Sequence, residues 1–292
     1  MSGTMSEIKA RLDAVKQTRQ ITNAMYLLSA SLTKKAMQNI DFNLRYMNKL
    51  RLTMKDILSK TNYSEIENRY ITEQTDGVTL FVVISADKRL CGSYNTDVID
   101  LATKEMKKHE SVVLASLGSV GNEMFRAKGI EPDYFWSDVM HHPTLYFASS
   151  IEKMILSLYN KHKVKEAYVV YTNYVSGSVR KPVCQRLLPL LTADFLDLED
   201  EYKYTATPIY EPSAEAAFDS IVPQYVTGFM YDVFMQSVSS ENAARMEAMQ
   251  NATDNADEMI KELSTEINAV RQLNITNEII EISAGSDIVG SV

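Results

Sequence analysis

The stretch SSENAARMEAMQNATDNADEMIKELSTEINAVRQLNITNEIIEI, residues 239–282, decides the fold. It contains neither Gly nor Pro, and an apolar residue recurs every third or fourth position, which is the period of an amphipathic helix. The predicted seam steps by 3, 4, 3, 4, 4 and 3 residues through Met249, Ala252, Ala256, Met259, Leu263, Ile267 and Val270. This alternation is typical of a coiled coil, so we expect a long helix with a second helix packed against the seam.

The first sixty residues carry another helical pattern. Residues 5–60 also lack Gly and Pro, and their apolar positions recur at helical spacing. The predicted stripe comprises Ile8, Leu12, Val15, Thr22, Met25, Leu28, Leu32, Leu44, Met47, Leu50, Met54 and Ile57. Because either stripe alone would be an exposed apolar surface, we expect the two terminal helices to form a rod, wound antiparallel as a long coiled coil.

The middle of the chain has a different pattern. The segment GVTLFVVIS (77–85) is rich in β-branched and aromatic residues, which favours a buried strand. Further strands are expected at 111–116, 133–136, 167–174 and 181–190, the last two paired across a turn at Ser176-Gly177-Ser178, and helices at 95–108, 121–129 and 146–163. Strands that alternate with helices predict a central Rossmann-like α/β globular domain.

These patterns divide the chain into five segments. We expect an N-terminal coiled-coil helix at 1–60, a linker at 61–75, the globular α/β domain at 76–195, a linker at 196–211 and a C-terminal coiled-coil helix at 212–292. Pro212 suits the first turn of the last helix, where its missing N–H costs nothing. Pro223 would lie inside that helix and predicts a kink or a short break near residue 220.

Charge and composition argue against several classes of protein. The 292 residues carry a formal net charge of -8 with a pI near 5.2, which opposes non-specific nucleic-acid binding, so no nucleic-acid partner is expected. The first 60 residues are nevertheless basic, and this asymmetry favours docking against another chain. The start, MSGTMSEIKARL, lacks the apolar core of a signal peptide, and no uncharged run approaches the ~18 residues of a membrane span. Only two cysteines occur, which favours a reducing cytoplasm over a disulfide framework.

Two weak motifs could be taken for cofactor or metal sites. The partial glycine motif GSVG at 118–121 lacks the spacing of a dinucleotide-binding turn. The adjacent His141 and His142 have no nearby cysteine cluster to complete a metal site, and a loop pair explains them more simply. We therefore expect no cofactor and no metal.

Cys91 is the one candidate nucleophile. It follows the first predicted strand, where α/β folds place ligand-binding turns, and neighbouring Lys88 and Arg89 would lower the pKa of its thiol. A small residue packed at a strand-to-helix turn explains Cys91 more simply. A small-molecule enzyme stays open as an alternative, although one of four histidines distant in sequence would have to fold close to the thiol as a base.

The end of the C-terminal helix differs from the seam before it. Its isoleucines fall on more than one helix face, which a two-stranded coil cannot bury. They are Ile275, Ile279, Ile280 and Ile282. Asn268 and Arg271 place polar groups near the seam, where they cost stability unless something satisfies them. The sequence thus predicts that another protein surrounds this end of the helix.

Four segments together resemble the gamma subunit of F-type ATP synthases, the central stalk of a rotary motor. They are IKARLDAVKQTRQITNAM (8–25), ISADKRLCGSYN (84–95), EPSAEAAFDSIVPQY (211–225) and the stretch from SSENAARM at 239 to NEIIEI at 282. Their order and spacing match as well, so the resemblance covers essentially the whole chain. It implies a non-catalytic rotor shaft that transmits torque between an ion-driven membrane ring and a catalytic hexamer.

The resemblance also implies partners and contact residues. The partners would be the alpha and beta subunits of the hexamer, the epsilon subunit and the membrane c-ring, with one copy of this chain per complex, peripheral to the membrane on the cytoplasmic face of a bacterial cell. By position, the residues expected to contact the catalytic subunits are Met25, Arg271, Gln272, Thr276, Glu278 and Glu281. Met25 is expected to face the others from the N-terminal helix.

The chain departs from the family's usual pattern near these contacts. Leu32 stands in a segment that usually has lysine and small residues, Arg89 replaces a glycine, Ile267 a tyrosine and Leu273 a small residue. These departures bear on how tightly the shaft couples, and they leave open a divergent ATPase, sodium-linked or not devoted to synthesis. A coiled-coil scaffold or adaptor without a rotary role is a further alternative, in which the terminal helices would pair with other chains.

Overall fold

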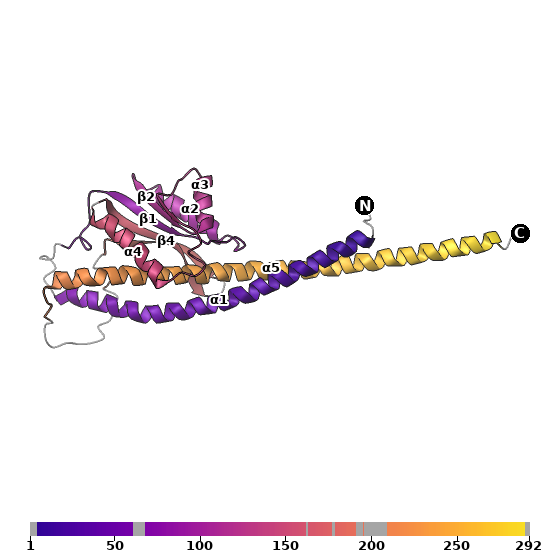
Figure 1. The fold of residues 1–292 in the computed structure, drawn as a ribbon, viewed down its shortest axis with the longest axis horizontal. Coiled ribbons are helices and arrows are strands. Elements are labelled where there is room, and N and C mark those ends of the chain that lie inside the picture. Colours follow the sequence, from indigo (N-terminus) through magenta and orange to yellow (C-terminus); the bar gives the residue numbers. More distant parts are fainter. Residues whose placement is uncertain are drawn as a thin grey trace. The chain divides into compact units, whose positions relative to one another are not determined.

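The computed structural model describes residues 5–60, 68–161, 163–176, 179–190, 195 and 209–289, without the side chains of Lys60, Glu281 and residues 283–289. Contacts divide the chain into two units, Met1–Leu28 with Met246–Val292 and Ser29–Arg245. Two helices pass through both units, α1 (Met5–Lys60) and α5 (Ala214–Val289), so the two long terminal helices are confirmed (Figure 1).

In the first unit, α1 and α5 pack against each other in antiparallel order. The buried side chains of Ile8, Leu12 and Leu263 form one apolar cluster. The Arg19 guanidinium donates to Asp257 at 2.5 Å, and the Thr22 and Thr253 hydroxyls lie 2.7 Å apart. Since the residue number rises on α1 while it falls on α5, these contacts confirm the predicted antiparallel coiled coil.

The seam of this coil keeps five of the seven residues that apolar spacing predicted on α5 and differs at two. On α5 its members are spaced by 4, 3, 4, 3, 4 and 3 residues, and they are Met249, Thr253, Ala256, Ile260, Leu263, Ile267 and Val270. Thr253 takes the place of Ala252 and Ile260, which packs against the apolar cluster, takes that of Met259; Leu28 on α1 is 60 % exposed, so its place in the stripe was wrong. The regular alternation continues because Thr253 takes a buried position, where its hydroxyl donates to the Met249 carbonyl oxygen at 2.8 Å and lies beside the Thr22 hydroxyl.

In the second unit, α1 and α5 again run antiparallel. The Asn39 amide donates to the Met235 sulfur at 3.6 Å, and the Asn43 amide donates to the Gly228 carbonyl oxygen at 2.9 Å. Leu44 is half exposed, so its predicted place in the stripe was also wrong. Each helix therefore pairs with the other end of its own chain in both units.

The globular part of the second unit is built on one sheet of five strands in the order β3-β2-β1-β4-β5. The strands are β1 (Val78–Ile84), β2 (Val112–Leu117), β3 (Tyr134–Trp136), β4 (Val164–Ser176) and β5 (Val179–Leu188). The first four are parallel, and β5 pairs with β4 in antiparallel order. The sheet confirms the predicted Rossmann-like α/β fold, while Gly177 and Ser178 of the predicted turn lie outside the described residues.

Helices cover both faces of this sheet. They are α2 (Tyr94–Met106), α3 (Ser119–Ala127) and α4 (Leu145–Asn160), together with α5. Alternate residues of β1 point to opposite faces. Phe81 packs in the cluster that contains Val98 of α2 and Phe125 of α3, whereas Val82 packs with Ile151 of α4 and Val226 of α5 (Figure 1). Both faces are therefore closed by apolar packing.

The start of α5 corrects two sequence expectations. The Ser213 hydroxyl accepts a hydrogen bond from the Ala216 N–H at 3.1 Å, so Ser213 caps the helix and Pro212 lies before the first turn rather than in it. The helix also continues through Pro223, so the short break near residue 220 was wrong, while the kink stays a prediction. Phe218 and Val222 are fully buried on this part of α5, and their packing outweighs the hydrogen bond that the proline removes.

The remaining expectations concern the linkers and the membrane. Residues 61–67 and 196–208 of the two predicted linkers lie outside the described residues. Within the described ranges, no helix combines the length and apolarity that a bilayer crossing requires.

Candidate partner-binding surface

The last described turns of α5 form an exposed surface with an unusual share of apolar side chains. Every residue from 271 to 280 is exposed. The large apolar side chains among the exposed residues near this end are Leu273, Ile275, Ile279, Ile280 and Ile282. The apolar cluster with α1 ends at Val270, so α1 covers none of these side chains. Large exposed apolar side chains gathered at one end of a helix normally mark a site of contact with another protein.

Most of the predicted contact residues lie together on this surface. Arg271, Gln272, Thr276 and Glu278 are exposed within two turns of α5, and the Thr276 hydroxyl donates to the Gln272 carbonyl oxygen at 2.9 Å. The side chain of Glu281 lies outside the described residues. The four described side chains present one cation, one anion and two neutral polar groups to whatever binds here.

Met25 does not face this group, which corrects the expectation from sequence. The contact of Thr22 with Thr253 sets the register of the two helices, and Met25 lies further along α1, away from Arg271. At a rise of about 1.5 Å per residue, the 18 residues from Thr253 to Arg271 span roughly 27 Å of helix. Met25 is half-buried beside an earlier part of α5. A match of single positions to a family pattern carries no information on the register between α1 and α5, so it could not place Met25.

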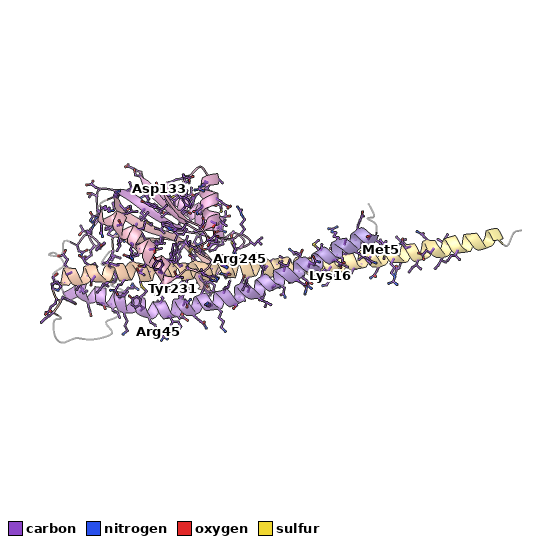
Figure 2. All side chains as sticks on the ribbon, viewed as in Figure 1. Met5, Lys16, Arg45, Asp133, Tyr231 and Arg245 are labelled. Carbon is purple, nitrogen blue, oxygen red and sulfur yellow. The ribbon has the colours of Figure 1, made fainter. Side chains whose placement is uncertain are left out.

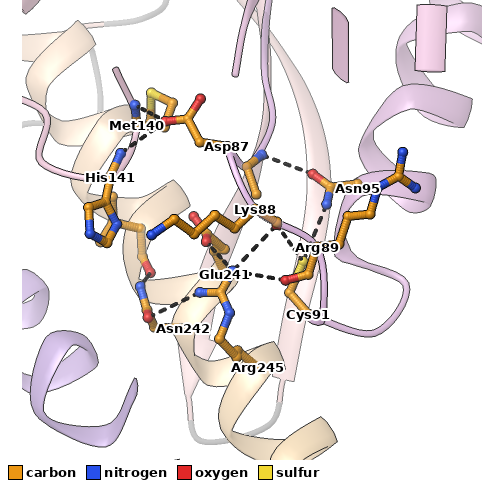
Figure 3. Close-up of polar contacts among 12 residues, drawn as sticks. Asp87, Lys88, Arg89, Cys91, Asn95, Met140, His141, Glu241, Asn242 and Arg245 are labelled. Atoms are coloured by element: carbon orange, nitrogen blue, oxygen red, sulfur yellow. Dashed lines mark hydrogen bonds and ion pairs between the residues drawn. The ribbon is translucent and has the colours of Figure 1, made fainter. Parts of the chain in front are cut away.

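A second polar site joins the loop after β1 to α5 within the second unit. The Arg245 guanidinium donates to Glu241 at 2.6 Å, to the Asn242 side chain at 3.3 Å, and to the carbonyl oxygens of Lys88 and Arg89 at 3.4 Å (Figure 3). Residues 237 to 244 of α5 are all buried. We name the contacts of Arg245 with the 88–89 carbonyl oxygens and with Glu241 the latch, because the two carbonyl contacts attach the loop after β1 to α5 and the ion pair with Glu241 holds Arg245 in place on the helix.

Asp87 organises the neighbouring loop. Its carboxylate accepts hydrogen bonds from the backbone N–H groups of Ser119, Asp138, Met140 and His141, at 2.6 to 3.1 Å. Figure 3 shows those from Met140 and His141. Sequence reasoning did not identify Asp87 or Glu241 as functional positions. The available signals were a carboxylate directly after a buried strand and a carboxylate inside a run of small buried residues on a helix.

The start of α3 explains why the partial glycine motif does not form a phosphate site. A free helix N-terminus binds anions through its first N–H groups. Here the N–H of Ser119 donates to Asp87, that of Val120 to the Ala86 carbonyl oxygen and that of Gly121 to the Ser85 hydroxyl. The protein itself therefore occupies the donors that a phosphate would need.

Cys91 is a buried structural residue and not an activated thiol. It is 2 % exposed, and the Asn95 amide donates to its sulfur at 3.3 Å. Burial, together with the nearby Glu241 carboxylate, raises the pKa of Cys91 to about 11. The expected lowering by Lys88 and Arg89 was wrong, because Arg89 extends to an ion pair with Glu123 at 2.7 Å.

The adjacent histidines, considered above as candidate metal ligands, contact each other. The rings of His141 and His142 lie 4.4 Å apart between centroids. Over the part of the chain that the structure describes, no group of three or more His, Cys, Asp or Glu side chains is arranged to hold a metal ion.

Comparisons with known proteins agree over the full length of the chain. The family model described as ATP synthase matches residues 4–289. The ATP synthase gamma chain of Ruminiclostridium cellulolyticum is 37% identical over 298 residues, which covers 98% of this chain and 99% of that relative. The ATP synthase gamma chain of Caldanaerobacter subterraneus subsp. tengcongensis is 38% identical over 295 residues, covering 97% and 99%.

Solved structures share the fold at lower identity. A chain of the Euglena gracilis mitochondrial ATP synthase, in a structure of OSCP, F1 and c-ring, superposes with a TM-score of 0.69 at 16% identity and covers 99% of this chain and 95% of its own length. A chain from the central stalk and c-ring of the Tetrahymena thermophila mitochondrial ATP synthase gives a TM-score of 0.58 at 21% identity, covering 80% and 99%. Both share long terminal helices around an α/β domain.

Proposed function

The chain belongs to the family of ATP synthase gamma chains, and on this premise we propose that it is the rotor shaft between the catalytic alpha and beta subunits and the membrane c-ring. It is a non-catalytic component of the complex. The observation that carries the proposal is the end of α5, where every residue from 271 to 280 is exposed and large apolar side chains accompany a few polar ones.

The chemistry of this surface suits a shaft that turns inside a collar of other subunits. Isoleucines on several faces slide against an apolar lining without any single strong contact. Arg271 and Glu278 form charge-assisted hydrogen bonds only where a complementary group comes within reach. Each orientation of the shaft therefore stabilises a different conformation of each surrounding catalytic site, which is allosteric coupling by differential contact.

We propose Met25, Arg271, Gln272, Thr276, Glu278 and Glu281 as contacts with the catalytic subunits. Met25 would contact the catalytic subunits at a different height along the coil from the other five residues, because the register of α1 and α5 separates it from Arg271. The five segments expected from sequence, 1–60, 61–75, 76–195, 196–211 and 212–292, stay our proposed division of the chain.

The latch connects the globular domain to α5, which a rotor shaft requires. Torque that enters through the globular domain must reach α5 without slippage. Arg245 on α5 donates to the carbonyl oxygens of Lys88 and Arg89, and Glu241, one turn earlier on the same helix, forms an ion pair with Arg245. We infer that these contacts transmit torque from the globular domain to the helix.

The family places this chain in a membrane-associated complex. We further propose that it is peripheral to the cytoplasmic face of a bacterial cell membrane, in one copy per complex and in contact with an epsilon subunit. The scaffold alternative required terminal helices that pair with other chains, whereas α1 and α5 pair with each other in both units. The enzyme alternative required an activated Cys91, and its thiol pKa is raised.

The test uses the complex purified from native membranes through a tag on this chain. Alpha- and beta-type subunits should co-purify, and Arg271→Ala should lower ATP hydrolysis or ion pumping. Thr276→Val and Thr265→Val form a matched pair, since both threonines are exposed on α5 and donate to the carbonyl oxygen four residues earlier. Only Thr276→Val should change coupling. Equal effects of the two, or a chain that purifies without ATPase subunits, would contradict the proposal.

A further inference from the structure

The carboxylate of Asp87 lies among backbone donors from two other segments of the second unit. Its Oδ1 atom accepts hydrogen bonds from the N–H of Ser119 and from that of Asp138, both at 2.9 Å, and from the Ser119 hydroxyl at 3.2 Å. Its Oδ2 atom accepts from the N–H of Met140 at 2.6 Å and from that of His141 at 3.1 Å (Figure 3). A carboxylate has about four lone-pair sites, so backbone N–H groups fill all of them. We name these four N–H groups the N–H nest.

The backbone of the nest is shaped for a negative group. Three of the four donors come from the loop after β3, in which Asp138 has a φ of 60°. A left-handed residue in a loop turns neighbouring N–H groups toward one point, which is how backbone nests bind anions. The fourth donor belongs to Ser119, the first residue of α3, where the helix dipole favours negative charge. Without an anion between them, these converging N–H groups would be left unpaired.

The nest borders the solvent. Asp138 and His141 are exposed, whereas Asp87 itself is only partly buried. A small anion could therefore reach the four N–H groups from the solvent if the side chain of Asp87 were shortened.

Occupation of the nest also fixes the loop after β1. Asp87 directly precedes Lys88 and Arg89, whose carbonyl oxygens accept the hydrogen bonds of Arg245 in the latch. The next residue, Leu90, has a φ of 67°, which is costly for a leucine and persists only where the surrounding structure holds it. The loop is thus attached on one side to the nest and on the other side to α5.

We propose that the N–H nest is a binding site for small carboxylates, which Asp87 occupies as an internal ligand, and that its occupation positions the loop at 88–91 for the latch. Asp87 is then a positioning residue, which acts on α5 through the loop and Arg245. A free carboxylate should be able to take its place. The binding site does not depend on the proposed function, and only its consequence for torque does.

The test is chemical rescue in the complex purified through a tag on this chain. Asp87→Ala removes three heavy atoms from the side chain, and a formate ion consists of the same three. The position of the loop is measured as the rate at which a thiol reagent labels Cys91, which is 2 % exposed, with Cys184 as the internal control. Asp87→Ala should raise the Cys91 rate at least about tenfold at pH 8, because the loop opens locally.

Formate should return the labelling rate of Cys91 in Asp87→Ala toward the native rate, while chloride at the same ionic strength should not. The small size of formate limits its Kd to on the order of 1 mM or weaker, so the titration extends to about 300 mM. The rate of Cys184 should be the same in every sample. Rescue by a specific anion is not expected if Asp87 acts only by filling space.

Asp87→Asn is the matched control. Its amide fills the nest without a negative charge and points an NH₂ group at N–H donors, so Cys91 should be labelled faster and formate should have no effect. The proposal is overturned if formate rescues both variants equally, if formate and chloride act alike on Asp87→Ala, or if Asp87→Ala leaves the Cys91 rate at its native value.

A second measurement covers a variant that does not fold. The refolded fraction of the full-length Asp87→Ala chain is then compared in formate and in chloride, and equal fractions overturn the proposal. If alpha- and beta-type subunits do not co-purify, the proposed function is wrong, whereas the nest is still tested by labelling of the full-length chain alone.

Discussion

Replacement of Arg245 by methionine removes the latch while keeping most of the side-chain volume. In the native chain the Arg245 and Glu241 side chains are each 11% exposed and lie 2.6 Å apart. The other hydrogen bonds of Arg245, at 3.3 and 3.4 Å, are longer and contribute less. The main consequence of Arg245→Met is therefore a buried Glu241 carboxylate without its cation.

The size of the effect follows from this unpaired charge. Breaking a buried ion pair by removing one partner costs about 3–5 kcal/mol. We expect Arg245→Met to lower the free energy of unfolding by about 3 kcal/mol at pH 8. Adding Glu241→Gln should recover at least about half of that loss, because no buried charge is then left unpaired.

The loss should depend on pH in a defined direction. Burial already raises the pKa of Glu241, and the Arg245 charge opposes that rise. Without Arg245, the pKa of Glu241 in the folded state should rise further above its unfolded value. The destabilisation is then fully present above the folded pKa and decreases as the pH falls through it, because the folded protein takes up the proton first.

Guanidinium unfolding followed by circular dichroism at pH 8 and pH 5 measures both effects. Arg245→Met should lose less stability at pH 5 than at pH 8, and the double variant should show little of this difference. A loss below about 1 kcal/mol at pH 8, or the same loss at both pH values, would refute the argument that Arg245 compensates the buried Glu241 charge on α5.

Three further perturbations have expected outcomes. Thr22→Val should lower the free energy of unfolding by at most about 1 kcal/mol, because the Thr253 hydroxyl loses Thr22 but keeps its bond to the Met249 carbonyl oxygen; a larger loss in chemical denaturation would contradict this. Cys91 should react with a thiol reagent far more slowly at pH 7 than a free cysteine, because the pKa of its thiol is raised to about 11. Rapid labelling of Cys91 in the folded chain would contradict its burial. Burial raises the pKa of Asp232 to about 6, so Asp232→Asn should raise the melting temperature at pH 8. This gain in melting temperature should shrink as the pH falls through about 6. A gain that is constant with pH would show that burial of the charge is not its cause.

The large elements of the fold could be predicted because their patterns are long. The Gly- and Pro-free segments gave both terminal helices, and the short β-branched runs gave the strands of the sheet. The errors lie where packing between distant segments decides. Pro223 does not interrupt α5, because apolar packing of Phe218 and Val222 holds that turn in place.

The candidate site was predictable in part. The exposed isoleucines on several faces of α5 indicated that another protein surrounds this end. The level of Met25 was not predictable from matched positions, because the register depends on the pairing of Thr22 with Thr253.

The most direct test of the shaft function is to measure rotation of this chain within its complex. The alpha–beta hexamer is fixed to a surface, and a probe is attached through Lys107→Cys at the exposed end of α2. The pKa of both native thiols is raised to about 11, so the introduced cysteine reacts selectively. We expect added ATP to drive continuous rotation of the probe in one direction. ATP hydrolysis at the normal rate while the probe stays stationary relative to the hexamer would contradict the shaft function.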